Sequence, residues 1–107
     1  MCTMVYTCIM KRICRSNVYK KWFKGLKDAI TRARIIARVD RLAAGNPGDC
    51  HFLGDISELR LKFGPGYRIY YKEIGKEIII LLCGGDKSTQ QQDITRAREI
   101  ATVYEEE

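Results

Sequence analysis

The chain has 107 residues, of which 46% are apolar, and a formal net charge of +6. This length predicts a single domain over residues 1–107 with a core of modest size. No apolar stretch approaches the ~20 residues of a membrane span, and the charges near the N-terminus follow the apolar residues, the wrong order for a signal peptide. The five cysteines, without a CxxC pair, fit neither a zinc site nor a disulfide framework. We therefore expect a cytoplasmic protein with reduced thiols and no metal or cofactor.

The positive charge is concentrated in the front part of the chain. Residues 11–41 hold eleven Lys or Arg against Asp28 and Asp40, a net charge of +9, whereas the remainder has a net charge of −3. Such an asymmetry predicts a polyanionic partner. Solvated helix faces on a basic protein are the alternative.

In chain order, residues 10–15 are predicted to form a first strand, and residues 1–9 a possible N-terminal extension. Ser16 or Asn17 can cap a helix whose apolar stripe is Tyr19, Trp22, Phe23 and Leu26. A second helix is predicted from about residue 28 to residue 44. Its apolar stripe contains Ile35, Val39 and Leu42, and Arg34, Arg38 and Arg41 form a separate ridge. Residues 45–49 are a dense turn signal.

Residues 58–72 predict a β-hairpin with one apolar face and one cationic face. The apolar positions are Leu59, Leu61, Phe63, Tyr67, Ile69 and Tyr71, and the alternate positions are Glu58, Arg60, Lys62, Arg68, Tyr70 and Lys72. A three-residue loop over residues 64–66, with Gly66 at positive φ, keeps the two faces separate. It places Lys62 opposite Arg68, a like-charge pair that a bound anion would stabilise. This face therefore points to phosphate, and so to RNA or DNA.

Residues 78–83 are apolar throughout, which predicts a central strand buried on both faces, with Cys83 as a small core residue. Residues 84–88 form a tight exit. Ser88 or Thr89 can cap a last helix that carries Ile94, Ala97, Ala101 and Tyr104. The order strand, helix, helix, three strands, helix predicts an α+β fold, with one small antiparallel or mixed sheet and the helices packed on one face.

Several segments, in this order and spacing, resemble RelE-type toxins, and specifically the HigB-like "addiction module killer" branch. The matching pieces are Trp22 and Leu26, Arg41 and Leu42, residues 45–49, 57–60, 64–68 and 84–88, and Asp93 with Ile94. The resemblance covers about residues 10–104. It implies a RelE-like fold and a metal-independent endoribonuclease that cuts mRNA, usually on the ribosome. It also implies a cognate antitoxin of helix-turn-helix type as the neutralising partner.

The chemistry implied is attack of a ribose 2′-hydroxyl on the adjacent phosphate. This needs a proton acceptor, cations on the phosphate and an acid for the leaving 5′-oxygen. Arg68 resembles the catalytic arginine of these toxins and can grip a phosphate with two hydrogen bonds; a surface salt bridge is its alternative role. Arg60 matches a position where RelE carries a functional lysine, and a salt bridge to Glu58 or Glu73 is its alternative.

Lys87 stands where many relatives place an arginine that supports the transition state. Asp93 falls near a tyrosine that RelE is thought to use in proton transfer, and it is equally suited to complement the helix dipole. His51 is the single histidine and is a further acid–base candidate, although a lone loop histidine is often incidental.

Further residues are expected to contact RNA: Lys62, Tyr70, Lys20, Lys21, Lys24, Arg34, Arg38 and Arg41. Tyr70 would stack on a base, and the helix cations would contact ribosomal RNA phosphates. Two other functions stay open. One is a catalytically degenerate module that binds RNA or its antitoxin on the same fold. The other is a DNA-binding domain, which is weaker because the sequence has no helix-turn-helix signature.

Overall fold

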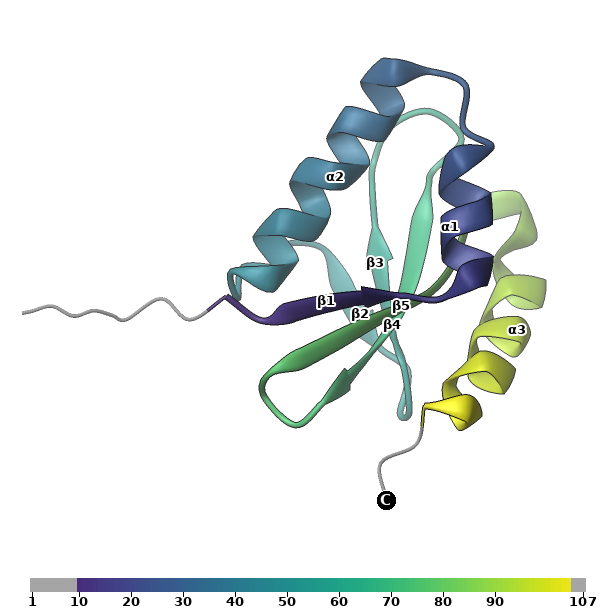
Figure 1. Ribbon diagram of the computed structural model, residues 1–107. Coiled ribbons are helices and arrows are strands. Elements are labelled where there is room, and N and C mark those ends of the chain that lie inside the picture. Colours follow the sequence, from purple (N-terminus) through teal and green to yellow (C-terminus); the bar gives the residue numbers. More distant parts are fainter. Residues whose placement is uncertain (1–9, 105–107) are drawn as a thin grey trace, which may run out of the picture.

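A computed structural model describes residues 10–104, and its ribbon is drawn in Figure 1. The expected N-terminal extension over residues 1–9 lies outside the described residues. The elements are β1 (Arg12–Arg15), α1 (Asn17–Lys24), α2 (Ala29–Ala43), β2 (Cys50–Phe52), β3 (Ser57–Arg60), β4 (Arg68–Ile74), β5 (Ile78–Gly85), the 3-10 helix η2 (Lys87–Thr89) and α3 (Gln90–Val103). The predicted α+β class is confirmed. No helix in the described part of the chain is long and apolar enough to cross a membrane.

Local signals explain where the first two helices begin. The Ser16 side chain accepts a hydrogen bond from the Tyr19 backbone N–H at 3.0 Å, which caps α1. Asp28 does the same for α2 through the Thr31 N–H at 3.2 Å. The predicted bounds of both helices therefore agree with the structure to within a residue or two.

The five strands form one mixed sheet in the order β1-β5-β4-β3-β2. β1 pairs with β5 in parallel, and the other neighbours are antiparallel. The sequence did not predict β2. This strand has only three residues and lies at the sheet edge, where Phe52 is 75% exposed, so it shows no alternation of buried and exposed positions.

The register of the β3–β4 hairpin corrects one prediction. Arg60, rather than Lys62, is paired with Arg68, a shift of two residues along β3. Gly64 has a positive φ of 57° in addition to Gly66 at 79°, and the resulting connection is longer than the three-residue loop predicted. Because a shift of two residues keeps every side chain on its own face, the predicted division into two faces is unaffected.

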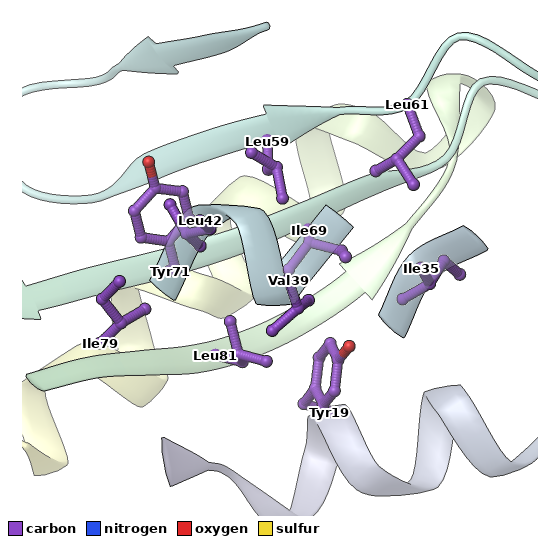
Figure 2. Packing of buried hydrophobic residues seen from close by; sticks show 10 residues of the cluster. All are labelled: Tyr19, Ile35, Val39, Leu42, Leu59, Leu61, Ile69, Tyr71, Ile79 and Leu81. Atoms are coloured by element: carbon purple, nitrogen blue, oxygen red, sulfur yellow. The ribbon is translucent and has the colours of Figure 1, made fainter. Parts of the chain in front are cut away.

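Two hydrophobic clusters lie on opposite faces of the sheet. Figure 2 shows the first, in which residues of α1 and α2 pack on one face. Its members are Tyr19, Ile35, Val39, Leu42, Leu59, Leu61, Ile69, Tyr71, Ile79 and Leu81. The second cluster joins the other face to α3: Ile56, Tyr70, Ile80, Leu82, Cys83, Ala97 and Ala101.

The prediction that all helices pack on one face is therefore wrong. β5 is apolar on both faces, as predicted, and its Ile80 and Leu82 need a cover that α1 and α2 cannot give. α3 supplies this cover from the opposite side, and its Ala97 is fully buried there. On the cationic face of the hairpin, Glu58, Arg68 and Tyr70 are consequently buried on the side of α3, whereas Lys62 stays exposed.

Candidate functional site

The candidate site is built around a buried carboxylate on β3. Glu58 is 0% exposed, and four side chains from three elements donate to it. Arg60 Nε lies 2.7 Å from Oε1, whereas Tyr70 OH, Gln90 Nε2 and Arg68 Nη1 lie 3.0, 2.9 and 3.4 Å from Oε2. We call these five residues the Glu58 cluster. β3 and β4 bring Glu58, Arg60, Arg68 and Tyr70 to one face, and α3 adds Gln90 over it.

Electrostatics keep the cluster in a defined protonation state. Burial alone would raise the pKa of the Glu58 carboxyl, but hydrogen bonds from Arg60, Gln90 and Tyr70 outweigh it, so the pKa lies below its ordinary value. Burial and the nearby charge of Glu58 raise the pKa of the Tyr70 hydroxyl. At neutral pH the cluster therefore holds an ionised carboxylate and a protonated phenol that donates to it.

Arg68 is 9% exposed and is only partly satisfied. Its Nη1 faces Glu58, but its Nε is buried without a hydrogen-bond partner among the described residues. Most buried polar groups in proteins have a partner, because an unpaired donor costs about 1–3 kcal/mol. The Arg68 guanidinium is thus fixed by Glu58 and, among the described residues, still has an N–H group free to donate to a ligand.

Lys87 and Asp93 reach the same end of the sheet as Arg68. Gly85 is the register partner of Arg68 on β5, and a Cβ at Gly85 would lie 1.8 Å from Asp93 Oδ2, so only glycine fits there. Asp93 accepts a hydrogen bond from Thr89 Oγ1 at 2.5 Å. Lys87 is exposed, and its backbone N–H donates to Pro65 O of the hairpin loop at 3.4 Å. Residues that the sequence separates widely therefore meet at one end of the β4–β5 pair.

His51 lies on the same face of the sheet. It is the register partner of Glu58 across β2 and β3, so the two side chains point the same way. Its Nε2 is 3.2 Å from Asp49 Oδ1, and the ring is partly exposed. β2, which the sequence did not predict, is what brings this histidine toward the cluster.

Two expected RNA contacts take other roles. Tyr70 is 0% exposed and donates to Glu58, so the expectation that it stacks on a base is wrong. Arg38 donates to the backbone carbonyls of Pro47, Asp49 and Arg60 at 2.9, 2.9 and 2.6 Å. Its guanidinium therefore fixes the fold rather than projecting from a basic ridge.

The remaining expected RNA contacts lie around three surface hollows. Lys20 and Lys24 border a groove of about 720 Å³ between α1 and α2, and Lys21 borders another of about 480 Å³. Arg34, Arg41 and Lys62 line a third hollow of about 190 Å³. The guanidinium of Arg34 lies 4.8 Å above the Phe63 ring, and Lys62, 83% exposed, is 3.7 Å from Asp49. The structure does not gather these cations into one patch.

Two members of the Glu58 cluster, Glu58 and Gln90, were not predicted from the sequence as site residues. Glu58 was considered only as a salt-bridge partner of Arg60. The alternation already placed Glu58 on the face of Arg68 and Tyr70, but only the observed register pairs it directly with Tyr70. Gln90 gave no signal, since nothing local shows on which face α3 packs.

Comparisons with known proteins place the fold and the family. A solved structure of a mutant of the E. coli toxin RelE in the free state superposes with a TM-score of 0.67 at 17% identity, covering 84% of this chain and 96% of that chain. At this identity the likeness concerns the fold alone, and the predicted RelE-like fold is confirmed.

A relative in Haemophilus influenzae, described as an uncharacterized protein, is 46% identical over 84 residues, which are 78% of this chain and 85% of the relative. The family described as phage-derived protein Gp49-like (DUF891) matches residues 21–106. Because this match spans most of the chain, including α2, the Glu58 cluster and α3, the protein belongs to the phage-derived Gp49-like family.

Proposed function

We propose that this protein is the toxin of a toxin–antitoxin pair, an endoribonuclease that cleaves mRNA. The observation that carries the proposal is the meeting of Arg68, Lys87 and Asp93 at one end of the sheet, with Arg60 and Arg68 both held by Glu58. The RelE-like fold supports it, because the neighbour of known structure is described as a toxin.

In the proposed reaction, the ribose 2′-oxygen forms a bond to the adjacent phosphorus while the bond from phosphorus to the 5′-oxygen breaks. Arg68 and Lys87 neutralise the charge that develops on the phosphoryl oxygens, and Arg60 supports them. Asp93 accepts the 2′-hydroxyl proton, and His51 supplies a proton to the leaving 5′-oxygen. The products are a 2′,3′-cyclic phosphate and a 5′-hydroxyl end, and the scheme uses only side chains of this protein.

The partners follow from the same proposal. The substrate is mRNA, bound on the ribosome in the cytoplasm, and a cognate antitoxin of helix-turn-helix type holds the enzyme inactive. Within the RelE-like toxins we place the chain in the HigB-like branch, on the segments around residues 45–49, 64–68 and 84–88 that carry that resemblance.

The test is induced expression with mapping of new 5′ ends on cellular mRNA. The wild type should stop growth and produce 5′-hydroxyl ends, whereas Arg68→Ala should reduce cleavage about a hundred- to a thousandfold, the usual cost of one transition-state contact. Lys76→Ala, which removes an exposed cation in the β4–β5 turn, is the matched control. Intact transcripts in cells that contain folded wild-type protein would contradict the nuclease proposal.

One observation favours a second candidate, a degenerate binding module. Arg68 is almost enclosed beside Glu58, to which Gln90 also donates, and Lys87 stands where the resemblance to RelE-type toxins implies an arginine. A module that only binds its antitoxin would form a stable complex with it and would leave growth and mRNA unchanged when expressed alone.

A further inference from the structure

A hollow of about 480 Å³ lies between α1 and α3, beside the end of β5. Although they cover opposite faces of the sheet, these two helices lie next to each other at the right of Figure 1. The hollow is lined by Asn17, Val18, Lys21, Trp22, Gly84 and Arg96. We call it the α1–α3 groove. The proposed reaction uses none of its residues.

The aromatic wall of the groove is rigid. A Cβ at Gly84 would lie only 2.3–2.5 Å from three atoms of the Trp22 indole, so the ring rests directly on the bare backbone of β5. The indole also meets the Tyr67 ring edge-on, with centroids 6.4 Å apart. Trp22 remains only partly buried. A flat aromatic surface held in this way is suited to stacking, because little conformational freedom is lost when a ligand binds.

The charged side chains of the groove are both cations. Lys21 comes from α1 and Arg96 from α3, both are exposed, and no carboxylate is among the residues that line the groove. An aromatic wall between a lysine and an arginine is the combination that binds single-stranded nucleic acid, with bases on the ring and phosphates on the cations. A purely apolar peptide would leave both cations unused.

The groove also adjoins the candidate site. Gly84 in its wall is followed by Gly85, the register partner of Arg68. On the other side Trp22 touches Tyr67, the neighbour of Arg68 in sequence. RNA that places a phosphate at Arg68 and Lys87 therefore needs only to continue past the glycines to enter the groove.

We propose that the α1–α3 groove binds a nucleotide of single-stranded RNA next to the cleaved bond, with its base on Trp22 and its phosphates on Lys21 and Arg96. This inference rests on the proposed nuclease function, which it extends by a substrate subsite. Because stacking on an indole accepts any base, the groove fixes the path of the strand rather than its sequence.

The experiment uses the whole protein and a 2′-O-methylated hexa-uridylate, whose blocked 2′-oxygen prevents cleavage. Trp22 is the single tryptophan of the chain, so its fluorescence reports on the groove alone. Binding should quench this fluorescence and saturate. The double variant Lys21→Gln with Arg96→Gln should weaken binding at least about tenfold. It should also make the negative slope of log affinity against log salt less steep by about 1.4, or roughly 0.7 for each lost contact.

The matched control is Lys27→Gln with Lys76→Gln, which removes the same charge from two exposed positions outside the groove. The proposal is overturned if the oligonucleotide does not bind, if bound oligonucleotide leaves the fluorescence unchanged, or if both double variants bind alike. A cleavage assay on unmodified RNA separates the two proposals. Cleavage without quenching refutes only the subsite. Quenching without cleavage refutes the nuclease, and with it the position of the groove beside a cleaved bond, but leaves the groove as an RNA-binding site.

Discussion

At the scale of single residues, Glu58 explains how two arginines, Arg60 and Arg68, are held close together. A fully buried carboxylate is costly unless donors surround it. Here two guanidinium groups, a phenol and an amide supply those donors. Their hydrogen bonds fix the two arginines as well as the acid, so Glu58 positions the cations that the proposed chemistry needs.

Removing the charge of Glu58 should lower stability. Glu58→Gln leaves Arg68 buried without its ion partner, and breaking a buried pair typically costs 3–5 kcal/mol. We expect a loss of about 3 kcal/mol, near the lower end, because the Arg60 side chain is partly exposed. Urea unfolding at pH 7 measures the loss, with Glu77→Gln, an exposed acid, as control. A change below about 1 kcal/mol would show that the cluster adds little to the fold.

The pKa of Glu58 predicts how this loss depends on pH. The folded pKa lies below the ordinary value, so the stabilisation by the carboxylate is complete above about pH 4.3, the unperturbed glutamate value. It is lost as the pH falls through the folded pKa. The difference in unfolding free energy between the wild type and Glu58→Gln should therefore shrink below about pH 4. Unfolding curves at pH 7, 4 and 3 test this, and a constant difference would contradict it.

At the scale of elements, Arg38 adds a polar link to the apolar packing of α2 on the sheet. Arg38 donates to carbonyls of the loop before β2 and to Arg60 O at the end of β3. Burial lowers the pKa of its guanidinium. This arginine therefore ties three segments together beneath the hairpin.

Arg38→Ala should destabilise the protein by roughly 1.5–3 kcal/mol, the range for hydrogen bonds that involve a charged group. Arg41→Ala removes a neighbouring exposed arginine of the same helix and should change stability by no more than about 0.5 kcal/mol. Thermal or urea unfolding of both variants measures this contrast. Equal effects would mean that the three carbonyls find other donors.

The elements that the sequence predicted share strong local signals. α1 and α2 have capping residues and an apolar stripe, and β5 has an uninterrupted apolar run. β2 has no such signal, and its pairing depends on β3 rather than on its own residues. The hairpin register depended on the shape of a loop, which two glycines at positive φ lengthen. The missing β2 and the wrong hairpin register therefore have the same cause, because both depend on contacts between segments rather than on the residues of one segment.

The candidate site too was predictable only where local patterns determine it. Alternation alone placed Arg60 and Arg68 on one face, and the structure agrees. Whether that face was open or covered depended on where α3 packs, and β5 decides this because its apolar residues need cover on both sides. The burial of Tyr70 and the role of Gln90 follow from this packing, so neither was visible in a local pattern.

At the scale of the whole molecule, the excess positive charge of residues 11–41 is spread over several surfaces. Lys20 and Lys24 lie at one groove, Lys21 at a second and Arg41 at a third. Spread charge favours approach to a large polyanion more than tight binding of one phosphate.

Ribosome association should therefore depend on salt and on the outer cations. Changing Lys20, Lys24 and Arg41 to glutamate should weaken co-sedimentation with ribosomes and flatten its salt dependence. The same change at Lys72, Lys76 and Arg98, outside the basic segment, should have a smaller effect on association. Sedimentation at two or more salt concentrations gives both quantities. Identical behaviour of the two triple variants would show that the front segment is only a solvated surface.

The parallel pairing of β1 with β5 sets the order in which the protein can be completed during its own synthesis. Arg12 can pair with Ile78 only after β5 has been synthesised, and both hydrophobic clusters also require residues of β5. Gln90 and Asp93, which complete the candidate site, are made later still. Contacts so distant in sequence form late. A nascent chain therefore lacks the assembled site until α3 has been synthesised and can pack on the sheet, which for the proposed nuclease protects the ribosome that is making it.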